Sequence, residues 1–332
     1  MSLPTDLIND PRDRPFLWLT AACTVVVPPF AAALYVPGLF RWWLAAAYLG
    51  LIAFVFLDRF ILMLHNTSHR PLFKRRWMNH YIPWVLGPFF GETPDTYYAH
   101  HVGMHHAEGN LREDLSSTME YQRDSALDFL RYYFRFITRG YLEVVAYFTR
   151  KNRPRLRRMF QRGEWAFFAM AAVLMFVNWR ATLVVFVFPV FAVRFLMMAG
   201  NWGQHAFVDP ATPESSYRNS ITVLDERYNR RCFNDGYHIG HHLVPVQHWT
   251  EMPEDFERNR EAYLREGAIV FEGIDYFGVW ARLMVKAYRS LARHYVSLAS
   301  TRPSEAAIVS LLRERVQRFP PQDAHEALPA EA

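Results

Sequence analysis

Histidine is the residue type in this sequence that most clearly suggests chemistry. The chain has 332 residues and 14 histidines, and nine of these histidines fall in four short clusters. The clusters are His65-x-x-x-His69, His101-x-x-x-His105-His106, Asn201-x-x-x-His205 and His238-x-x-His241-His242. Imidazole nitrogens are good ligands for iron, zinc, copper and nickel, so the clusters predict a metal site.

The spacing within each cluster predicts how the ligands divide between metal ions. Residues i and i+4 lie on one face of a helix, so His65 and His69 are expected to face the same ion. His101 and His105 repeat this spacing, whereas His106 is turned by about 100° and suits a second ion. The last cluster follows the same pattern at i, i+3 and i+4.

The number of histidines narrows the type of metal. Zinc takes four ligands, and catalytic zinc takes only three from the protein, so nine imidazoles exceed a single zinc site. They fit two ions with four or five nitrogen ligands each, with coordination positions left open, which favours redox-active iron that binds oxygen. The two cysteines, Cys23 and Cys232, exclude a disulfide framework, an iron–sulfur site and a cysteine-rich zinc module.

Apolar runs predict the elements that position these histidines. The chain is 51% hydrophobic, and its candidate membrane spans are residues 16–36, 42–64, 165–179 and 181–200. About 20 apolar residues cross the ~30 Å of hydrocarbon in a bilayer. A cleaved signal peptide is the competing interpretation of the first run. The acidic start at Asp6 and Asp10 and the Pro28-Pro29 pair argue against it.

The second pair of runs is short, because fifteen helical residues rise only about 22 Å. One long helix, or a core hairpin of a soluble protein, are alternatives. We favour two crossings, with Arg180 and Arg194 extending to the interface at the ends of the spans.

The distribution of basic residues predicts the orientation in the membrane. Arginines and lysines concentrate in residues 65–163, whereas the proposed outer loops hold little beyond Arg41 and Arg180. Cytoplasmic loops carry such an excess, so residues 65–163, residues 201–318 and both termini are expected to be cytoplasmic. A bacterial inner membrane fits better than the endoplasmic reticulum. The net charge of +5 comes without a nucleic-acid-binding motif, so no nucleic acid partner is expected.

The predicted fold class is therefore an all-α integral membrane protein. We expect about four transmembrane helices and a helical cytoplasmic cap that carries the histidine clusters. Residues 1–318 form a single domain in this prediction, and residues 319–332 form a disordered tail.

Together, the four clusters resemble the histidine boxes of the membrane fatty acid desaturase superfamily, which includes alkane and related hydroxylases. The resemblance covers about residues 40–260, and the stretch from His241 to Trp249 is similar to the segment after the last box of desaturases. It implies a di-iron centre that uses O2 as co-substrate to attack an unactivated C–H bond of a lipid-like chain. The ligands it implies are His65, His69, His101, His105, His106, His205, His238, His241 and His242.

The reaction outcome stays open at this point. Desaturation of a fatty-acyl or similar lipid chain is the first hypothesis, and hydroxylation of an alkane, acyl or terpenoid chain is the second. The spacing of the middle box is shared with alkane monooxygenases, and Asn66 follows His65 where many members carry an acidic residue. A non-enzymatic metal-binding membrane protein is a third hypothesis. It predicts ionisable residues deep in several spans, and few are present.

Electrons are expected from a separate carrier, because the sequence has no His-Pro-Gly-Gly haem motif of a fused cytochrome b5 domain. A ferredoxin, a rubredoxin or a cytochrome b5 is the implied type of donor. The arginine-rich cytoplasmic face could steer an acidic donor, or it could simply follow the positive-inside rule.

Four residues are expected to contact the ligands rather than the metals. Asp58, two turns before His65, and Asp235, three residues before His238, could accept from a ligand's ring N–H or serve only as interface anchors. By the resemblance, Asn201 holds a metal-bound water. His100 adjoins the middle cluster but breaks its register.

The other histidines and several aromatic residues have weaker assignments. His80, His248, His294 and His325 are expected at the interface or the surface. Trp84, Phe89 and Phe90 are candidates to line a substrate tunnel, although such residues more often serve packing in membrane proteins.

Overall fold

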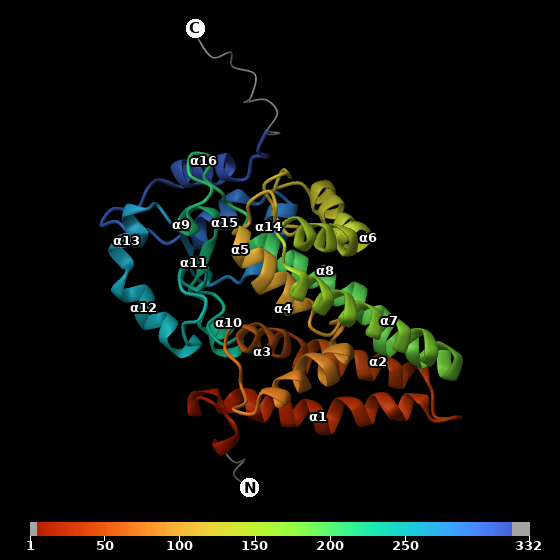
Figure 1. Cartoon of the computed structure of the whole chain (residues 1–332). Coiled ribbons are helices and arrows are strands. Elements are labelled where there is room, and N and C mark those ends of the chain that lie inside the picture. The colour runs from red at the N-terminus through yellow and green to blue at the C-terminus, as the bar shows by residue number, and fades with distance from the viewer. Residues whose placement is uncertain (1–4, 321–332) are drawn as a thin grey trace.

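The computed structural model describes residues 5–320, and in this range the chain is mostly helical (Figure 1). Three helical segments are long and apolar enough to cross a membrane, namely Pro11–Tyr35, Trp42–His69 and Pro154–Gln204. The predicted all-α, membrane-compatible class is therefore confirmed.

The first two segments form a helical hairpin. It comprises α1 (Arg14–Tyr35), α2 (Trp42–Leu51), a π-helical stretch η3 (Ile52–Phe56) and α3 (Leu57–His69). Phe30 of α1 packs against Tyr48 of α2 with ring centroids 5.5 Å apart. One face of α1 is buried, whereas large apolar residues such as Trp43 and Phe54 face outward, and Phe54 is 82% exposed. An outward apolar surface of this kind suits contact with lipid.

The third segment is folded back on itself. It consists of α7 (Pro154–Thr182), η8 (Leu183–Val187) and α8 (Phe188–Gln204), and Asn178 interrupts it with non-helical backbone angles (φ −157°, ψ 95°). Arg194 Nη2 lies 3.0 Å from Glu164 Oε1 across the fold. A straight helix would separate residues 30 positions apart by about 45 Å, so the alternative of one long helix is wrong.

The two limbs of this second hairpin correspond to the two short apolar runs of the sequence. Val173 and Phe176 on the first limb are 64% and 92% exposed, and Phe188 at the start of α8 is 55% exposed. A core hairpin of a soluble protein would bury such residues, so their exposure favours the membrane interpretation.

Both hairpins reverse at the same end of the molecule, on the right in Figure 1. Asn178 Nδ2 donates to the carbonyl oxygen of Leu34 at 3.3 Å, and the hydroxyls of Tyr35 and Thr182 lie 2.8 Å apart. The four limbs therefore run side by side, and the ends that carry His69 and His205 lie at the opposite end.

The remaining elements pack between the hairpins or form the cap at that opposite end. Between the hairpins lie η4 (Arg76–His80), η5 (Ile82–Leu86), η6 (Gly87–Phe90), α4 (Thr96–His100), η7 (His101–His105), α5 (His106–Glu108) and α6 (Ala126–Arg150). After the second hairpin come α9 (Ser216–Asn219), α10 (Glu226–Arg231), α11 (His238–Leu243), η9 (Trp249–Glu251), α12 (Met252–Arg258), α13 (Arg260–Arg265), α14 (Tyr276–Met284), α15 (Tyr288–His294) and α16 (Glu305–Arg315).

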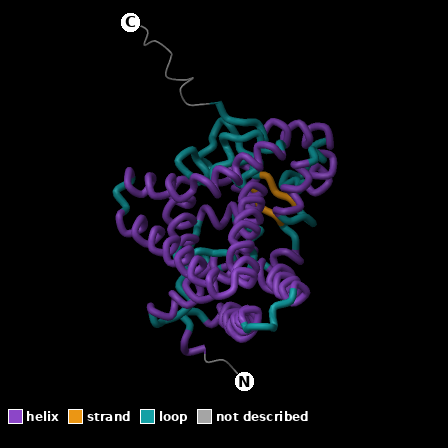
Figure 2. The backbone as a smooth tube through the Cα atoms, turned by 90° about the vertical axis from the view of Figure 1, so that its right-hand side faces the viewer, coloured by secondary structure: helices purple, strands orange, loops and turns teal. Residues whose placement is uncertain are grey.

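Two short strands are an addition to the predicted helical architecture (Figure 2). β1 (Ile221–Val223) and β2 (Ile269–Phe271) pair in parallel, with Ile221 opposite Ile269. All six residues are buried, so the pair serves as a core element of the cap.

The beginning of the predicted tail packs on the cap. The backbone N–H of Phe319 donates to the carbonyl oxygen of Met119 at 2.9 Å, and the Arg123 guanidinium lies over the Phe319 ring. The remainder of the predicted tail, residues 321–332, lies outside the described residues.

Candidate metal centre

The structure brings all nine predicted histidines together as two groups. The first histidine group consists of His65, His69, His101, His106 and His241, and the second of His105, His205, His238 and His242. Within each group, the nitrogen atoms that could bind an ion lie within 4.8 Å of one another. The division into five and four matches the expectation of two ions with four or five ligands each.

Each group draws on elements that are distant in the sequence. The end of α3 supplies His65 and His69, and the α4–η7–α5 segment supplies His101, His105 and His106. The residue after α8 is His205, and α11 supplies the remaining three. Because α3 and α8 each end at the cap, the two hairpins carry their histidines at the same end of the molecule.

The prediction for the middle cluster was wrong in one respect. His101 shares its group with His106, and His105 belongs to the other group. The cause is the π-helical turn η7, in which the His106 N–H donates to the His101 carbonyl oxygen. An α-helix would set residues five apart about 140° from each other, whereas the i to i+5 hydrogen bond of a π-helix aligns them.

The last cluster behaves as its spacing predicts. His238 and His242, four residues apart on the α-helix α11, lie in the same group. His241 turns to the other group. Its Nε2 atom lies 2.8 Å from His65 Nε2 and 2.9 Å from His106 Nε2.

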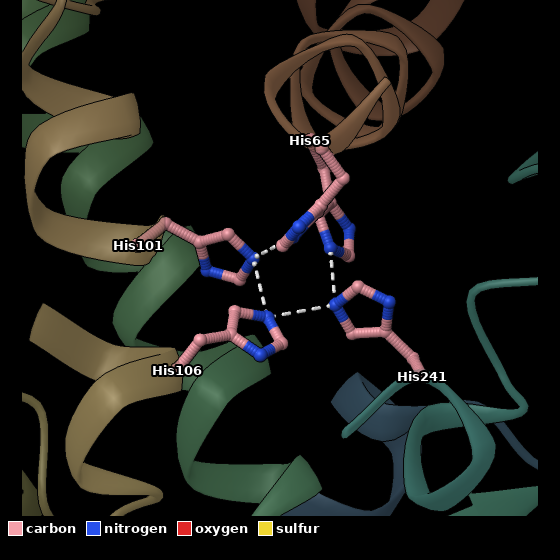
Figure 3. Close-up of side chains that lie close together, drawn as sticks. His65, His101, His106 and His241 are labelled. Atoms are coloured by element: carbon pink, nitrogen blue, oxygen red, sulfur yellow. Dashed lines mark hydrogen bonds between the residues drawn. The ribbon is translucent and has the colours of Figure 1, made fainter. Parts of the chain in front are cut away.

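The nitrogen spacing in the first group fits metal coordination. Figure 3 shows the rings of His65, His101, His106 and His241 facing one another. Their successive Nε2 contacts measure 2.8 to 3.1 Å. Two metal–nitrogen bonds of about 2.1 Å at right angles would place their nitrogens about 3.0 Å apart. The same spacing recurs in the second group, where His238 Nε2 lies 3.2 Å from His205 Nε2 and 3.1 Å from His242 Nε2.

Partners behind the rings fix which nitrogen carries the proton. His105 Nδ1 donates to Asp114 Oδ2 at 2.6 Å, and His205 Nδ1 donates to the Asn219 carbonyl oxygen at 2.8 Å. His65 Nδ1 lies 3.4 Å from Asp235 Oδ1. A neutral imidazole that donates through Nδ1 presents an unprotonated Nε2, which is the form that binds metals. The Nε2 lone pairs of His105 and His205 therefore face their neighbours without a proton.

Burial lowers the pKa of most of these imidazoles. Burial and the charge that His105 would carry together lower the pKa of His205 to about 3. The pKa values of His101, His106, His238, His241 and His242 are also lowered, first by burial and then by the neighbouring imidazoles. Neutral imidazoles crowded at ligand distances suit a bound cation, so the donor set fits metal ions.

Of the two predicted aspartates, one lies at the histidines. Asp235 faces His65, and its Oδ2 accepts from the Tyr228 hydroxyl at 2.6 Å. Asp58 instead pairs with Arg231 of α10. Two helical turns separate Asp58 from His65 by about 10.5 Å along the axis, and the Nδ1 atom of His65 is turned to Asp235.

Asn201 and His100 lie close to the second histidine group. Asn201 Nδ2 donates to the Ser116 carbonyl oxygen at 2.9 Å and to the Tyr132 hydroxyl at 2.8 Å. His100 Nε2 lies 3.9 Å from Asp114 Oδ1. Burial lowers the pKa of His100 to about 4 despite the opposing charge of Asp114.

Sequence reasoning missed Asp114, which holds His105. Its carboxylate is fully buried and also accepts from the backbone N–H and hydroxyl of Ser116 at 2.8 and 2.7 Å. Burial raises its pKa, but the charge of His105 and the hydrogen bond from it reverse the effect and leave the pKa below the usual range. Asp114 follows His105 by nine residues in an irregular segment, where no periodicity indicates the contact.

The expectation of a surface position was wrong for His248. Its side chain is 1% exposed, and His248 Nε2 lies 3.1 Å from Asp13 Oδ1, which also accepts from the Trp249 indole N–H at 3.0 Å. Asp13, near the start of the chain, thus binds the segment that follows α11. His80 and His294 lie in exposed or partly exposed positions, and His325 lies outside the described residues.

An apolar cavity of about 1160 Å³ lies against both histidine groups. His65 and His101 of the first group and His105 and His238 of the second form part of its wall. Most of the remaining wall is apolar and comes from the two hairpins and α6, including Leu57, Ile61, Phe136, Val144, Phe168 and Met197. A hydrocarbon chain in this cavity would therefore lie next to both groups.

The predicted tunnel aromatics pack elsewhere. Phe90 stacks on Phe60 with ring centroids 3.8 Å apart, and Phe89 packs 5.4 Å from Phe186. Trp84 lies under the Arg162 guanidinium. Arg194 also differs from its prediction, because it turns inward to Glu164 instead of extending to the interface. A carboxylate on the facing limb compensates the buried guanidinium, as a low-dielectric site requires.

Comparisons with known proteins agree with the histidine pattern. The family model described as fatty acid desaturase matches residues 40–273. No curated protein and no solved structure matches the chain. The match covers the second limb of the first hairpin, the whole second hairpin and every histidine of the two groups. The chain belongs to the fatty acid desaturase family.

Proposed function

We propose that this chain is a membrane di-iron oxidoreductase that uses O2 to desaturate a fatty-acyl or similar lipid chain. One observation carries the proposal: nine buried or partly buried histidines form groups of five and four, and one largely apolar cavity borders both groups. Membership of the fatty acid desaturase family supports this type of oxidoreductase.

Iron suits this set of nitrogen donors better than a structural zinc ion with a closed coordination shell. Five and four nitrogen ligands leave positions free at a six-coordinate ion, and a structural zinc site takes only four ligands in a closed shell. Two iron ions held there would supply the activation of O2 and the removal of hydrogen from an unactivated C–H bond.

The protein residues contribute placement and proton control. Asp114 and the Asn219 carbonyl orient His105 and His205 through Nδ1, and Asp235 Oδ1 lies 3.4 Å from His65 Nδ1. The apolar part of the cavity wall suits a methylene chain, which would lie beside His65 and His105. Asn201, anchored to Ser116 and Tyr132, keeps its amide beside the second group, where its role is to hold a water molecule.

The overall reaction balances with an external reductant. Desaturation converts –CH2–CH2– and O2 to –CH=CH– and two H2O, and it consumes two electrons and two protons from outside. Two further electrons come from the two broken C–H bonds. We assign the external electrons to a separate donor of the ferredoxin, rubredoxin or cytochrome b5 type. Hydroxylation would use the same inputs to form one alcohol and one H2O.

In this proposal the histidine end of the molecule faces the cytoplasm, and so do both termini. Exposed basic residues gather near this end, including Lys151 and Arg155 at the start of the second hairpin and Arg230 beside the cap. The positive-inside rule supports this orientation, with a bacterial inner membrane as the favoured location.

Lipid profiling tests the reaction. The chain is expressed with a ferredoxin and its reductase in a host fed a deuterated C18 fatty acid, and the lipids are analysed by mass spectrometry. We expect an O2-dependent product that has lost two hydrogens, and no product from His101→Ala or His241→Ala. The gain of one oxygen would establish the hydroxylase instead. An iron-loaded, reduced chain that changes no lipid would contradict both.

A further inference from the structure

One carboxyl group in the cavity wall has no role in holding the histidines. Glu92 follows η6, its side chain is 4% exposed, and it lines the same cavity as His65 and His101. Glu92 Oε1 is buried and has no hydrogen-bond partner among the described residues. An unpaired buried carboxyl oxygen is costly, so its presence in a cavity wall points to a ligand.

The charged side chains around Glu92 already pair with groups other than Glu92. Glu164 Oε1 accepts from Arg194 at 3.0 Å and from the Thr96 hydroxyl at 3.2 Å, and it also accepts from the Thr93 hydroxyl. Arg194 donates to Thr93 as well, at 3.1 Å. Among the described residues, Arg194 is the cation that lies beside Glu92. It is shared by other partners, and Glu92 is left as a second carboxyl beside the ion pair.

The position of Glu92 is fixed by close backbone packing on both sides. A Cβ atom on Gly91 would lie 2.4 Å from the Pro189 carbonyl oxygen, and one on Gly163 would lie 1.6 Å from that of Pro94. The segment of residues 91–94 is thus wedged between the two limbs of the second hairpin. Glu92 cannot swing out to solvent without moving this segment.

We propose that Glu92 is a substrate-positioning group that binds an uncharged oxygen function, a hydroxyl or a carbonyl, carried within the lipid chain in the cavity. This inference rests on the proposed function, because it assigns the polar part of the substrate of that same site. The oxygen at Glu92 would fix how far the chain enters, and hence which carbon lies at the histidine groups.

The protonation of Glu92 agrees with this role. Burial raises its pKa to about 8, Arg194 opposes this shift, and Glu164 adds to it. The carboxyl group is then protonated at pH 7. It can donate to a carbonyl or hydroxyl oxygen and accept from a hydroxyl, whereas a plain methylene chain would leave it unpaired.

Binding of matched C18 probes tests the assignment on the purified, iron-loaded chain. Octadecanoic acid is compared with its monohydroxy and mono-oxo isomers by displacement of tritiated octadecanoic acid. We expect a narrow set of oxygen positions to bind about tenfold tighter than octadecanoic acid, as a buried hydrogen bond of ordinary strength predicts. Glu92→Gln should keep this preference, and Glu92→Leu should lose it.

Two controls separate the role of Glu92 from a structural one. Met175→Leu changes an exposed apolar side chain outside the cavity wall and should keep the oxygen preference. If Glu92→Leu does not fold, infrared spectroscopy decides the question. The C=O stretch of the protonated carboxyl, assigned by its loss in Glu92→Gln, should shift when the preferred isomer binds and stay unchanged with octadecanoic acid.

The outcomes distinguish this inference from the proposed function. The inference is overturned if no isomer binds tighter than octadecanoic acid, or if folded Glu92→Leu keeps the preference. If the protein desaturates an octadecanoyl chain but binds no oxygen-bearing isomer more tightly, the proposed function would hold and the inference about Glu92 would fail. A preference that depends on Glu92 in a chain that oxidises no lipid would support the binding site and contradict the function.

Discussion

His101 and His106 lie in the same histidine group with their Nε2 atoms 3.1 Å apart, whereas His105, which is adjacent to His106, belongs to the other group. The π-helical turn between them produces this alternation. π-Turns are rare and frequently occur at functional sites, and here the turn lets one short segment supply ligands to both histidine groups.

Loss of one ligand from each group should affect different metal sites. We expect both His105→Ala and His106→Ala to abolish lipid oxidation and to lower bound iron, because each removes an Nε2 from a different group. Iron per chain is measured by mass spectrometry on purified protein. His80→Ala, at an exposed position, is the control and should retain the parental iron content. Two irons per chain in either ligand variant would contradict the assignment.

Asp114→Asn should weaken iron binding without removing a ligand. The carboxylate accepts from His105 Nδ1 at 2.6 Å, and loss of such a partner typically lowers metal affinity 10- to 100-fold. Competition with an iron chelator measures the change. The adjacent Glu113→Gln is the matched control, since that side chain is 45% exposed and pairs with Lys151 at the surface. Equal affinities of the two variants would count against the role of Asp114.

The contact between Gly163 and Pro94 should tolerate no side chain. A Cβ at Gly163 would lie 1.6 Å from a backbone oxygen, so Gly163→Ala should destabilise the protein by about 1–3 kcal/mol or more, as overpacking does. Gly50→Ala meets nothing within 4 Å and should be neutral or slightly stabilising. Unfolding in detergent compares the two, and a Gly163→Ala variant of unchanged stability would contradict the packing.

Glu92 should make stability fall as pH rises. Its pKa is raised from 4.5 to about 8 by burial, so the folded state holds a proton that the unfolded state loses above about pH 4.5. Between about pH 4.5 and 8, the free energy of unfolding should decline relative to Glu92→Gln by about 1.4 kcal/mol per pH unit. Below pH 4.5 the difference should be constant. Parallel pH profiles of the two proteins would show that Glu92 ionises normally.

Cysteine labelling tests the proposed orientation. The native Cys23 and Cys232 are buried, so the unmodified chain should not react with an impermeant maleimide. In intact spheroplasts, Leu39→Cys in the first reversal should react, because this residue is half exposed. Arg155→Cys and Arg265→Cys, at exposed positions of the histidine end, should react only after permeabilisation. Reaction of Leu39→Cys and Arg265→Cys from the same side would contradict the four-limb topology.

Much of the architecture follows from local sequence patterns. Apolar runs predict the helical hairpins, because a chain in hydrocarbon must satisfy its backbone hydrogen bonds internally. The histidine spacing likewise predicts nine candidate ligands, and the i, i+4 rule correctly pairs His65 with His69 and His238 with His242. These properties depend on neighbours within a few residues along the chain.

The tertiary structure decided what depends on contacts between distant segments. The π-turn at His101–His105 reassigns one ligand, and the periodicity of an ideal α-helix could not predict it. Asp114 at His105, Arg194 at Glu164 and Asp13 at His248 are brought together only when the hairpins and the cap pack. The unpaired carboxyl of Glu92 likewise depends on contacts between distant segments. Its burial is set by the two limbs that enclose residues 91–94, and no spacing in the sequence encodes that enclosure.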